Sequence, residues 1–216
     1  MGGQRVLVVT AMRSEAKPLR RAAPPGVDVV VTGMGTALAA EATTAALDAG
    51  SYERVVMIGI AGGIGPTVTV GDLVVPEVVL DHASGDELRP DRFGPIEPRG
   101  ALHTSDQFIQ DPAEVAALVA RGVVGLDMET AAVGRVCVGR GVPWSVFRGI
   151  SDHAEHLPVD PAVLAMTGPE GEPKPAAVAR YLATHPHKVA GLARLAKGAN
   201  AAIEVSTAAL LAALGA

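Results

Sequence analysis

The stretch from Gly125 to His153 constrains the fold of this chain more than any other. Its pattern predicts the end of one strand, then a helix, a turn containing glycine, and a second, apolar strand. Each strand end is followed by an acidic residue, Glu129 for the first and Asp152 for the second. A parallel β-α-β crossover would bring both carboxylates to one edge of a sheet, where open α/β sheets bind their ligands. These two residues therefore form the candidate chemical centre.

Short continuous apolar runs alternate with helical patterns along the rest of the chain, and such runs predict strands that are buried on both faces. The predicted strands cover 5–10, 27–32, 54–60, 73–82, 101–104, 123–127 and 144–150, and the predicted helices cover 14–21, 37–49, 112–121, 130–140, 175–184 and 186–216. We therefore expect a single α/β domain, residues 1–216, with three αβα layers around a central, mostly parallel, twisted sheet of six or seven strands. Residues 83–100 are expected to form an exposed loop.

Composition excludes several classes of protein. A net charge of −5 leaves no excess of basic residues for binding a nucleic-acid backbone. No run of roughly 18 apolar residues predicts a membrane span, and the N-terminus lacks a signal-peptide pattern, so a soluble, cytoplasmic protein is expected. The single cysteine, Cys137, is expected to be an inert core residue. The histidines lack the spacing of a zinc site, and the pair His153 and His156 lies in a predicted loop.

A third carboxylate, Glu15, follows the first predicted strand at the start of a helix. As a first-turn glutamate it would interact favourably with the helix dipole; as a site residue it would join Glu129 and Asp152. Three converging carboxylates without a metal or redox cofactor suit acid/base chemistry such as the cleavage of a glycosidic bond. From the residues alone, a generic α/β ligand-binding domain is the competing interpretation.

The turns after the second and third predicted strands are rich in glycine. Gly33-Met34-Gly35 and Ala61-Gly62-Gly63 either place backbone N–H groups against a ligand or are simply tight turns. Neither turn carries the fingerprint of a dinucleotide site or the lysine of a P-loop. In a polar loop farther along, Phe108 is either a loop anchor or a platform on which a base stacks.

Six short motifs also occur in a fixed order between residues 5 and 153. They are Ala11-Met-x-x-Glu15, Gly33-Met-Gly35, Gly59-Ile-Ala-Gly-Gly63, Val70-Gly-Asp72, Asp127-Met-Glu-Thr-Ala-Ala132 and Ile150-Ser-Asp152. In this order the sequence resembles the purine nucleoside phosphorylase / uridine phosphorylase superfamily, and within it the 5′-methylthioadenosine/S-adenosylhomocysteine nucleosidases. The resemblance implies a nucleoside phosphorylase-like fold, no cofactor, and release of adenine from a 5′-substituted adenine nucleoside by cleavage of its N-glycosidic bond.

The resemblance implies roles for individual residues as well. Asp152 would protonate N7 of the purine, and Glu15 would be the general base that activates water. Glu129 would hold the ribose hydroxyls, with Met128 packed on the ribose. The other contacts would come from Phe108 stacked on the base, from the Ile109 backbone at its edge, and from Ala61, Gly62 and Gly35.

The sequence departs from those nucleosidases in three places. Segment 19–31 is too short for the strand pair usual there, which implies a simpler sheet or a more open pocket. Ile60 replaces a serine that would supply a polar contact. From Val159 onward, including Pro169 to Pro173, the chain resembles instead the hopanoid-associated phosphorylase branch, which releases adenine from adenosylhopane. An adenosylhopane-type phosphorylase and a non-catalytic nucleoside-binding domain are therefore the alternatives.

The arginines bear on the choice between water and phosphate. Phosphorylases of this superfamily hold phosphate with arginines near the glycine turns, and here Arg13 and Arg54 are the only nearby candidates. Arg148, inside an apolar strand, is expected to be a buried partner of a carboxylate. Hydrolysis is favoured, with phosphate kept as the alternative co-substrate.

The resemblance also implies a homodimer or larger homo-oligomer, because in this superfamily a neighbouring subunit often closes the pocket. The last predicted helix carries an apolar stripe that is expected to cover the sheet, with a dimer contact as the alternative. The stripe consists of Val189, Leu192, Leu195, Ala199 and Ile203.

Overall fold

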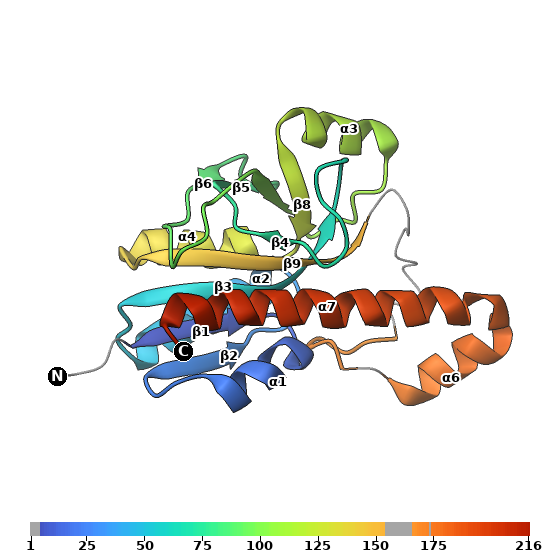
Figure 1. The fold of residues 1–216 in the computed structure, drawn as a ribbon, viewed down its shortest axis with the longest axis horizontal. Helices are drawn as coiled ribbons and strands as arrows, with labels where there is room; N and C mark the ends of the chain where they lie inside the picture. The colour runs from blue at the N-terminus through green and yellow to red at the C-terminus, as the bar shows by residue number, and fades with distance from the viewer. Residues whose placement is uncertain (1–4, 154–165, 173) are drawn as a thin grey trace.

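The computed structural model describes residues 5–153, 166–172 and 174–216, which form a sheet between layers of helices (Figure 1). The strands are β1 (Val6–Thr10), β2 (Val27–Val31), β3 (Arg54–Gly63), β4 (Leu73–Val74), β5 (Val78–Asp81), β6 (Glu87–Leu88), β7 (Ala101–Thr104), β8 (Val123–Asp127) and β9 (Trp144–His153). The helices are α1 (Arg13–Ala22), α2 (Thr36–Ala49), α3 (Pro112–Ala120), α4 (Thr130–Arg140), α6 (Pro175–Thr184) and α7 (Val189–Leu214), with the 3-10 turn η1 (Pro186–Lys188). The predicted three-layer α/β architecture is confirmed.

The sheet has more strands than the six or seven predicted. Within the described residues nine strands join it, along the path β2-β1-β3-β8-β7-β5-β6, while β9 pairs with β3 and β4. Five neighbouring pairs are parallel, and the three antiparallel pairs are β3–β8, β4–β9 and β5–β6. The sheet is therefore mostly parallel, as predicted.

Strand β3 is shared between two parts of the sheet. Most of its length pairs with β9, and its first half also pairs with β1. Its last residues, Gly62 and Gly63, keep β9 on one side and pair on the other side with Leu126 and Gly125 of β8, which runs antiparallel to β3. The predicted crossover between adjacent parallel strands is thus wrong, because β8 and β9 flank β3 and run in opposite directions. Gly62 nevertheless lies opposite both Leu126 and Asp152, so the two strand ends still meet at the end of β3.

The core has a layer on each face of the sheet. Along β1, Leu7 and Val9 pack toward α2 and α4, whereas Val6 and Val8 pack toward α1 and α7. A strand with apolar groups on both faces is what the continuous apolar run predicts. Cys137 is buried in the first of these layers, and burial raises the pKa of its thiol to about 12, which fits an inert core residue.

Two predicted segments differ in the structure. The long strand expected over 73–82, with a bend around Pro76, is instead divided there into β4 and β5, which pair with different neighbours, since proline has no N–H to continue a ladder. The loop expected over 83–100 contains β6. It is also tied to the start of β9, because Asp91 exchanges backbone and side-chain hydrogen bonds with Trp144.

Helix α7 divides into two halves. From Gly198 onward it is buried against β9 and β3, with Ile203 only 8% exposed. Its residues before Gly198 and all of α6 contain no buried side chain, and these parts extend past the sheet in Figure 1. The apolar stripe therefore covers the sheet only in its C-terminal half, and Val189 is 49% exposed. None of the described helices, α7 included, is long and apolar enough to cross a membrane.

Candidate active site

The Glu15 carboxylate is buried at the start of α1. One of its oxygens, Oε2, accepts a hydrogen bond from the Met12 N–H at 2.8 Å, and the other, Oε1, accepts from the Ile60 N–H at 2.9 Å. The side chain thus joins the turn after β1 to the end of β3 and satisfies backbone donors at the N-terminus of α1. Burial raises the pKa of Glu15, although the Arg148 charge and the backbone N–H groups oppose the rise.

Glu129 follows β8 and is also buried. Its Oε1 accepts a hydrogen bond from the Gly35 N–H at 2.9 Å, and its Oε2 accepts from the Arg148 guanidinium at 3.2 Å. The carboxylate therefore links the glycine turn after β2 to the middle of β9. Burial raises the pKa of Glu129 to about 7, with the Arg148 charge opposing this rise and the Asp127 charge adding to it.

Arg148 is the largest fully buried side chain in the described structure. Its Nη2 donates to Asp127 and to Glu129, and its Nε and Nη2 lie 3.2 and 3.0 Å from the Thr130 hydroxyl. Asp127 also accepts from the hydroxyls of Thr104, at 2.6 Å, and Thr130. The prediction that Arg148 is the buried partner of a carboxylate is confirmed. We call these five residues the arginine cluster.

Gly59 allows Glu15 to approach Arg148. Its φ is +149°, and a Cβ built there would lie 2.7 Å from the Arg148 Nη1 and closer still to the Glu15 Oε1. The two side chains therefore meet over the bare backbone of β3. Through Arg148, the structure brings Glu15 and Glu129 to one site.

Asp152 lies farther along β9, beside Gly62. A Cβ built on Gly62 would lie 3.6 Å from the Asp152 Oδ2, and the Ser151 hydroxyl donates to the other carboxylate oxygen. Burial raises the pKa of Asp152, against the lowering effect of the Ser151 hydrogen bond. A carboxyl group with a raised pKa can keep its proton nearer to neutral pH and deliver it to a leaving group.

Other predicted contact residues surround the same end of β3. Ala61 and Gly62 belong to β3 itself, and Met128 is half-buried directly before Glu129. Gly35, with φ +100°, presents its N–H to the Glu129 carboxylate. The structure thus brings these four residues to the carboxylates.

Phe108 and Ile109 lie in the loop between β7 and α3. Phe108 is 46% exposed, which favours the stacking surface over the loop anchor, whereas the Ile109 side chain is buried under α3. Asp106 of the same loop caps α2 by accepting from the Thr36 N–H at 2.8 Å. Its Oδ1 would also lie 3.3 Å from a Cβ on Gly35, so this loop lies next to the glycine turn.

Segment 166–172, which we call the strap, crosses the turns after β1 and β2. The Arg13 N–H donates to the Glu170 carbonyl at 3.1 Å, and the Met34 N–H donates to the Pro169 carbonyl at 2.8 Å. The Glu170 carboxylate forms an ion pair with the Arg13 guanidinium. A distant part of the chain thus takes up two N–H groups and one cation beside the carboxylates.

The remaining predicted residues lie away from the site or outside the described part. Arg54 begins β3, at the end opposite to Gly62, and donates to the Ser145 hydroxyl at 2.7 Å. His156, Val159 and Pro173 lie outside the described residues. Within the described residues, no group of three or more His, Cys, Asp or Glu side chains is arranged to hold a metal ion.

Four features of the site were not predicted as functional from the sequence: Asp127, Thr104, Asp106 and the strap. Asp127 had a local signal, because an arginine inside an apolar strand requires an acidic partner and Asp127 directly precedes Met128-Glu129. No local sequence pattern predicts that the strap contacts Arg13.

The chain is similar in sequence to proteins that are already known. The sequence model of the Phosphorylase superfamily matches residues 25–99 and 95–184. The chain is 33% identical over 168 residues to the 5′-methylthioadenosine/S-adenosylhomocysteine nucleosidase of Shewanella sp. strain W3-18-1. This alignment covers 62% of the present chain and 73% of the Shewanella protein.

Two crystal structures with the same enzyme name have a similar fold. The Neisseria meningitidis protein, in complex with methylthio-immucillin-A, gives a TM-score of 0.71 at 18% identity and covers 98% of both chains. The Colwellia psychrerythraea protein, in complex with adenine, gives 0.71 at 20% identity and covers 99% of this chain and 96% of its own.

Proposed function

Since the chain belongs to the Phosphorylase superfamily, we propose that it hydrolyses the N-glycosidic bond of a 5′-substituted adenosine and releases adenine. The observation that carries this proposal is the placement of Glu15, Glu129 and Asp152 along the last part of β3, each carboxyl group with a raised pKa. The curated relative supports an adenine nucleoside as the substrate class. The 5′ substituent is left open within that class.

The three carboxylates have separate tasks in this proposal. The Asp152 carboxyl donates its proton to N7 of the purine, so that the base leaves with the electron pair of the glycosidic bond. Glu15 takes a proton from water, whose oxygen bonds to the anomeric carbon. Glu129 holds the ribose hydroxyls, Met128 packs on the sugar, and Phe108 stacks on the base. Ala61, Gly62, Gly35 and the Ile109 backbone complete the contacts.

Water is favoured over phosphate because the donors near Glu15 are already occupied. The Met12 and Ile60 N–H groups bind the Glu15 carboxylate, and the Arg13 N–H binds the Glu170 carbonyl. The Arg13 guanidinium is paired with Glu170. A phosphate dianion there would find these donors already occupied, and the negative charge of the Glu15 carboxylate would repel it. Phosphorolysis of an adenosylhopane-type substrate is the alternative suggested by the C-terminal segment.

The test is a substrate panel with product identification. The protein is incubated with methylthioadenosine, S-adenosylhomocysteine, adenosine and adenosylhopane, each with and without phosphate. We expect free adenine and a free 5′-substituted ribose, at a rate that phosphate does not change. A ribose 1-phosphate product would replace hydrolysis by phosphorolysis. If the protein binds these nucleosides but releases no base, it is not an enzyme for them, and the alternative of a non-catalytic nucleoside-binding domain is supported.

Single substitutions test the assigned roles. Because general acid–base catalysis contributes roughly 10²–10⁴-fold, Asp152→Asn and Glu15→Gln are each expected to lower kcat on adenine nucleosides by at least about 10²-fold. Steady-state release of adenine measures this, and Glu41→Gln on the exposed side of α2 is the control. Unchanged kcat in either site variant would contradict its role.

We also infer that residues 1–216 form one domain that assembles as a homodimer or larger homo-oligomer in the cytoplasm. Light scattering of the purified chain measures the assembly. A single cooperative unfolding transition is expected for one domain, and a purely monomeric chain would contradict the assembly.

A further inference from the structure

Charge is distributed very unevenly along the chain. Residues 174–197, which we call the basic hairpin, contain five cations and no Asp or Glu: Lys174, Arg180, Lys188, Arg194 and Lys197. The rest of the chain then carries thirteen Lys and Arg against all twenty-three Asp and Glu. A segment of net charge +5 is therefore attached to a body of net charge −10.

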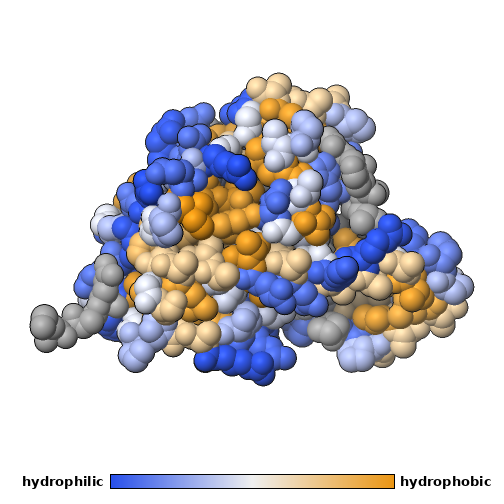
Figure 2. Space-filling view, viewed as in Figure 1, coloured by the Kyte–Doolittle hydropathy of each residue, from blue (hydrophilic) through white to orange (hydrophobic). Residues whose placement is uncertain are grey.

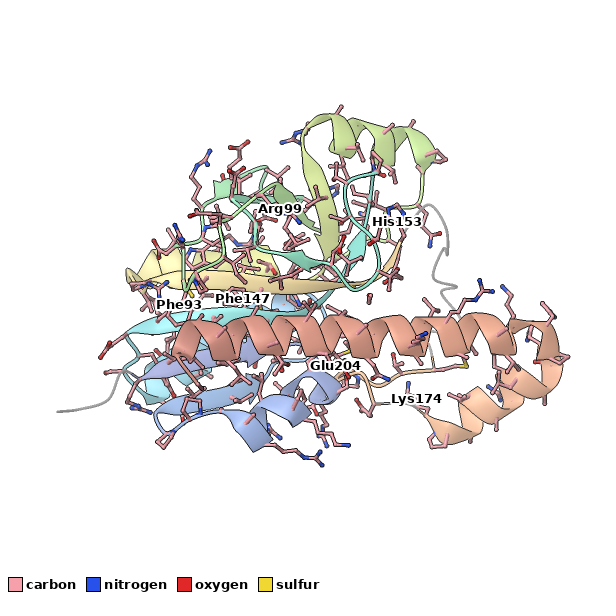
Figure 3. The ribbon with its side chains drawn as sticks, viewed as in Figure 1. Phe93, Arg99, Phe147, His153, Lys174 and Glu204 are labelled. Atoms are coloured by element: carbon pink, nitrogen blue, oxygen red, sulfur yellow. The ribbon has the colours of Figure 1, made fainter. Side chains whose placement is uncertain are left out.

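The basic hairpin consists of α6, η1 and the first part of α7. It projects past the sheet in Figure 1, and Figure 3 labels Lys174 at its start and Glu204, the first acid after it. All five cations are exposed. Because neither α6 nor the part of α7 before Gly198 contributes a buried side chain in the described structure, the contacts of the core do not account for this projection.

Apolar side chains accompany these cations. They recur at helical spacing on both helices and are half-buried or exposed, and Figure 2 shows apolar surface beside hydrophilic surface at this end of the molecule. On α6 they are Val178, Tyr181 and Leu182, and on α7 they are Val189, Leu192 and Leu195. Helices that combine Lys and Arg with accessible aliphatic groups are typical of segments that lie in a membrane interface.

Helix α1 extends the same surface. It packs against α7 and lies on the same side of α7 as α6 in Figure 1. Its outer side carries three exposed cations, Lys17, Arg20 and Arg21, while its one acid, Glu15, is buried. An anionic surface would thus attract this side of the molecule and repel the acidic remainder, which fixes one orientation.

We propose that the basic hairpin docks on the surface of an anionic lipid bilayer, with its aliphatic side chains in the interface and its cations on the headgroups. Two other partners fit less well. Single-stranded nucleic acid requires stacking platforms, and Tyr181, the only Phe, Tyr or Trp of the hairpin, is already stacked on His185 with ring centroids 4.5 Å apart. A second copy docked face to face through this surface would place like charges opposite each other.

Flotation with lipid vesicles tests the proposal. The full chain is mixed with vesicles of phosphatidylcholine alone or with added phosphatidylserine, at low and at high salt. We expect binding only to the phosphatidylserine vesicles, with loss at high salt. Each cation near such a surface contributes roughly fivefold in affinity, so the triple variant Arg180→Glu, Arg194→Glu, Lys197→Glu should bind at least about 100-fold more weakly.

A matched triple variant changes the net charge equally at exposed arginines elsewhere: Arg89→Glu, Arg92→Glu and Arg121→Glu. It should bind the vesicles within a few-fold of the unsubstituted chain. Leu192→Ser with Leu195→Ser tests the aliphatic contribution and should weaken binding without removing its salt dependence. Adenine release from a soluble nucleoside should be the same in all variants, so that failure here is distinct from failure of the proposed function.

Three results would overturn the proposal. The first is no binding to phosphatidylserine vesicles, and the second is equal loss of binding in the two triple variants. The third is that the hairpin variant loses binding to single-stranded oligonucleotide, or loses self-association, and shows no change on vesicles.

Discussion

At the scale of single residues, Arg148 of the arginine cluster compensates the charges of the carboxyl groups that are buried in the site. Arg148 is surrounded by Asp127, Glu129 and Glu15, so one buried cation faces three buried carboxyl groups. Such a set is favourable only while each member has its partners. Burial raises the pKa of Glu129, and the neighbouring Asp127 and Glu15 charges add to this rise because the single Arg148 charge opposes it only in part.

The pKa of Glu129 makes stability depend on pH. Its pKa rises from 4.5 to about 7 on folding, so between these values the folded chain holds a proton that the unfolded chain has lost. The contribution of Glu129 to the free energy of unfolding is therefore fully present below about pH 4.5 and is lost, by up to about 3 kcal/mol, as pH rises through about 7. Glu15 and Asp152 act in the same direction.

Glu129→Gln should therefore reduce this decline without abolishing it. Urea denaturation between about pH 5 and about pH 8 measures the decline for each variant. Glu41→Gln, on the exposed side of α2, should keep the full decline. If the two variants have the same pH dependence, Glu129 does not titrate as described.

Removal of the buried Arg148 cation should strongly lower the free energy of unfolding. Arg148→Met leaves Asp127 and Glu129 without a positive partner, and breaking a buried pair in this way costs about 3–5 kcal/mol. Adding Asp127→Asn to the same chain should recover part of that loss, since it removes the uncompensated charge. Urea unfolding of both single variants and the double variant gives the coupling, and strictly additive losses would contradict the cluster.

The residues of the site were predictable to different degrees. Glu15, Glu129 and Asp152 could be predicted because each follows an apolar run, and strand ends are where an α/β sheet binds its ligands. Arg148 could be predicted as buried from the apolar residues around it. The sequence offers Asp127 and Glu129 as acidic candidates for its partner, but it does not show that both pair with Arg148, because the way β8 and β9 meet at β3 depends on strand direction, which a local pattern does not contain.

At the scale of elements, α7 packs on β9 backbone to backbone at two glycines. A Cβ on Gly149 would lie 2.6 Å from the Ala202 Cα, and a Cβ on Gly198 would lie 3.1 Å from the Ser151 carbonyl carbon and even closer to its oxygen. Neither neighbour is a flexible side-chain end, so the helix would have to move away from the sheet. This close packing carries the buried half of α7.

Gly198→Ala should therefore destabilise the protein by about 1–3 kcal/mol, as overpacking does, although alanine is the better helix former. Gly191→Ala in the same helix is the matched control, since a Cβ there meets nothing within 4 Å. It should stabilise by up to about 1 kcal/mol. Thermal unfolding of both variants separates them, and a shift of the same sign in both would contradict the close packing.

The elements themselves were mostly predictable, since the apolar runs and helical patterns place all seven predicted strands close to observed ones. The exceptions have physical causes. Pro76 ends the pairing of β4 at a point where the apolar pattern continues. The first half of β3 pairs in parallel with β1, whereas Gly62 and Gly63 at its end pair with β8, which runs antiparallel. Pairing of this kind is decided by non-local contacts.

At the scale of the whole molecule, the strap joins two distant parts of the chain beside the site. The strap accepts hydrogen bonds from the Arg13 and Met34 N–H groups, and we infer that these bonds keep an anion away from Glu15. On this inference, the preference for water over phosphate depends on the contact between the strap and the turns after β1 and β2. It does not depend on a single site residue. This explains why the motifs of residues 5–153 were not enough to choose between the two reactions.

Loosening the strap should make the enzyme sensitive to phosphate. Gly171 has φ +74°, and a Cβ there would lie 2.5 Å from the Met12 Cγ, so Gly171→Ala strains the backbone of the strap and crowds the Met12 side chain. We expect this strain to loosen the strap from the turn. The freed N–H groups at the start of α1 would then bind an anion. Adenine release by Gly171→Ala should fall as phosphate is added, whereas the unsubstituted chain should show no change.

Gly85→Ala is the control for backbone strain alone, because Gly85 has φ +77° and open space around its Cα. The left-handed conformation costs alanine about 1–2 kcal/mol at either position, so both variants lose similar stability from this cause. Only Gly171→Ala should respond to phosphate. If both variants respond, or neither does, the strap does not control access of the anion, and the preference for water must come from the Glu15 carboxylate alone.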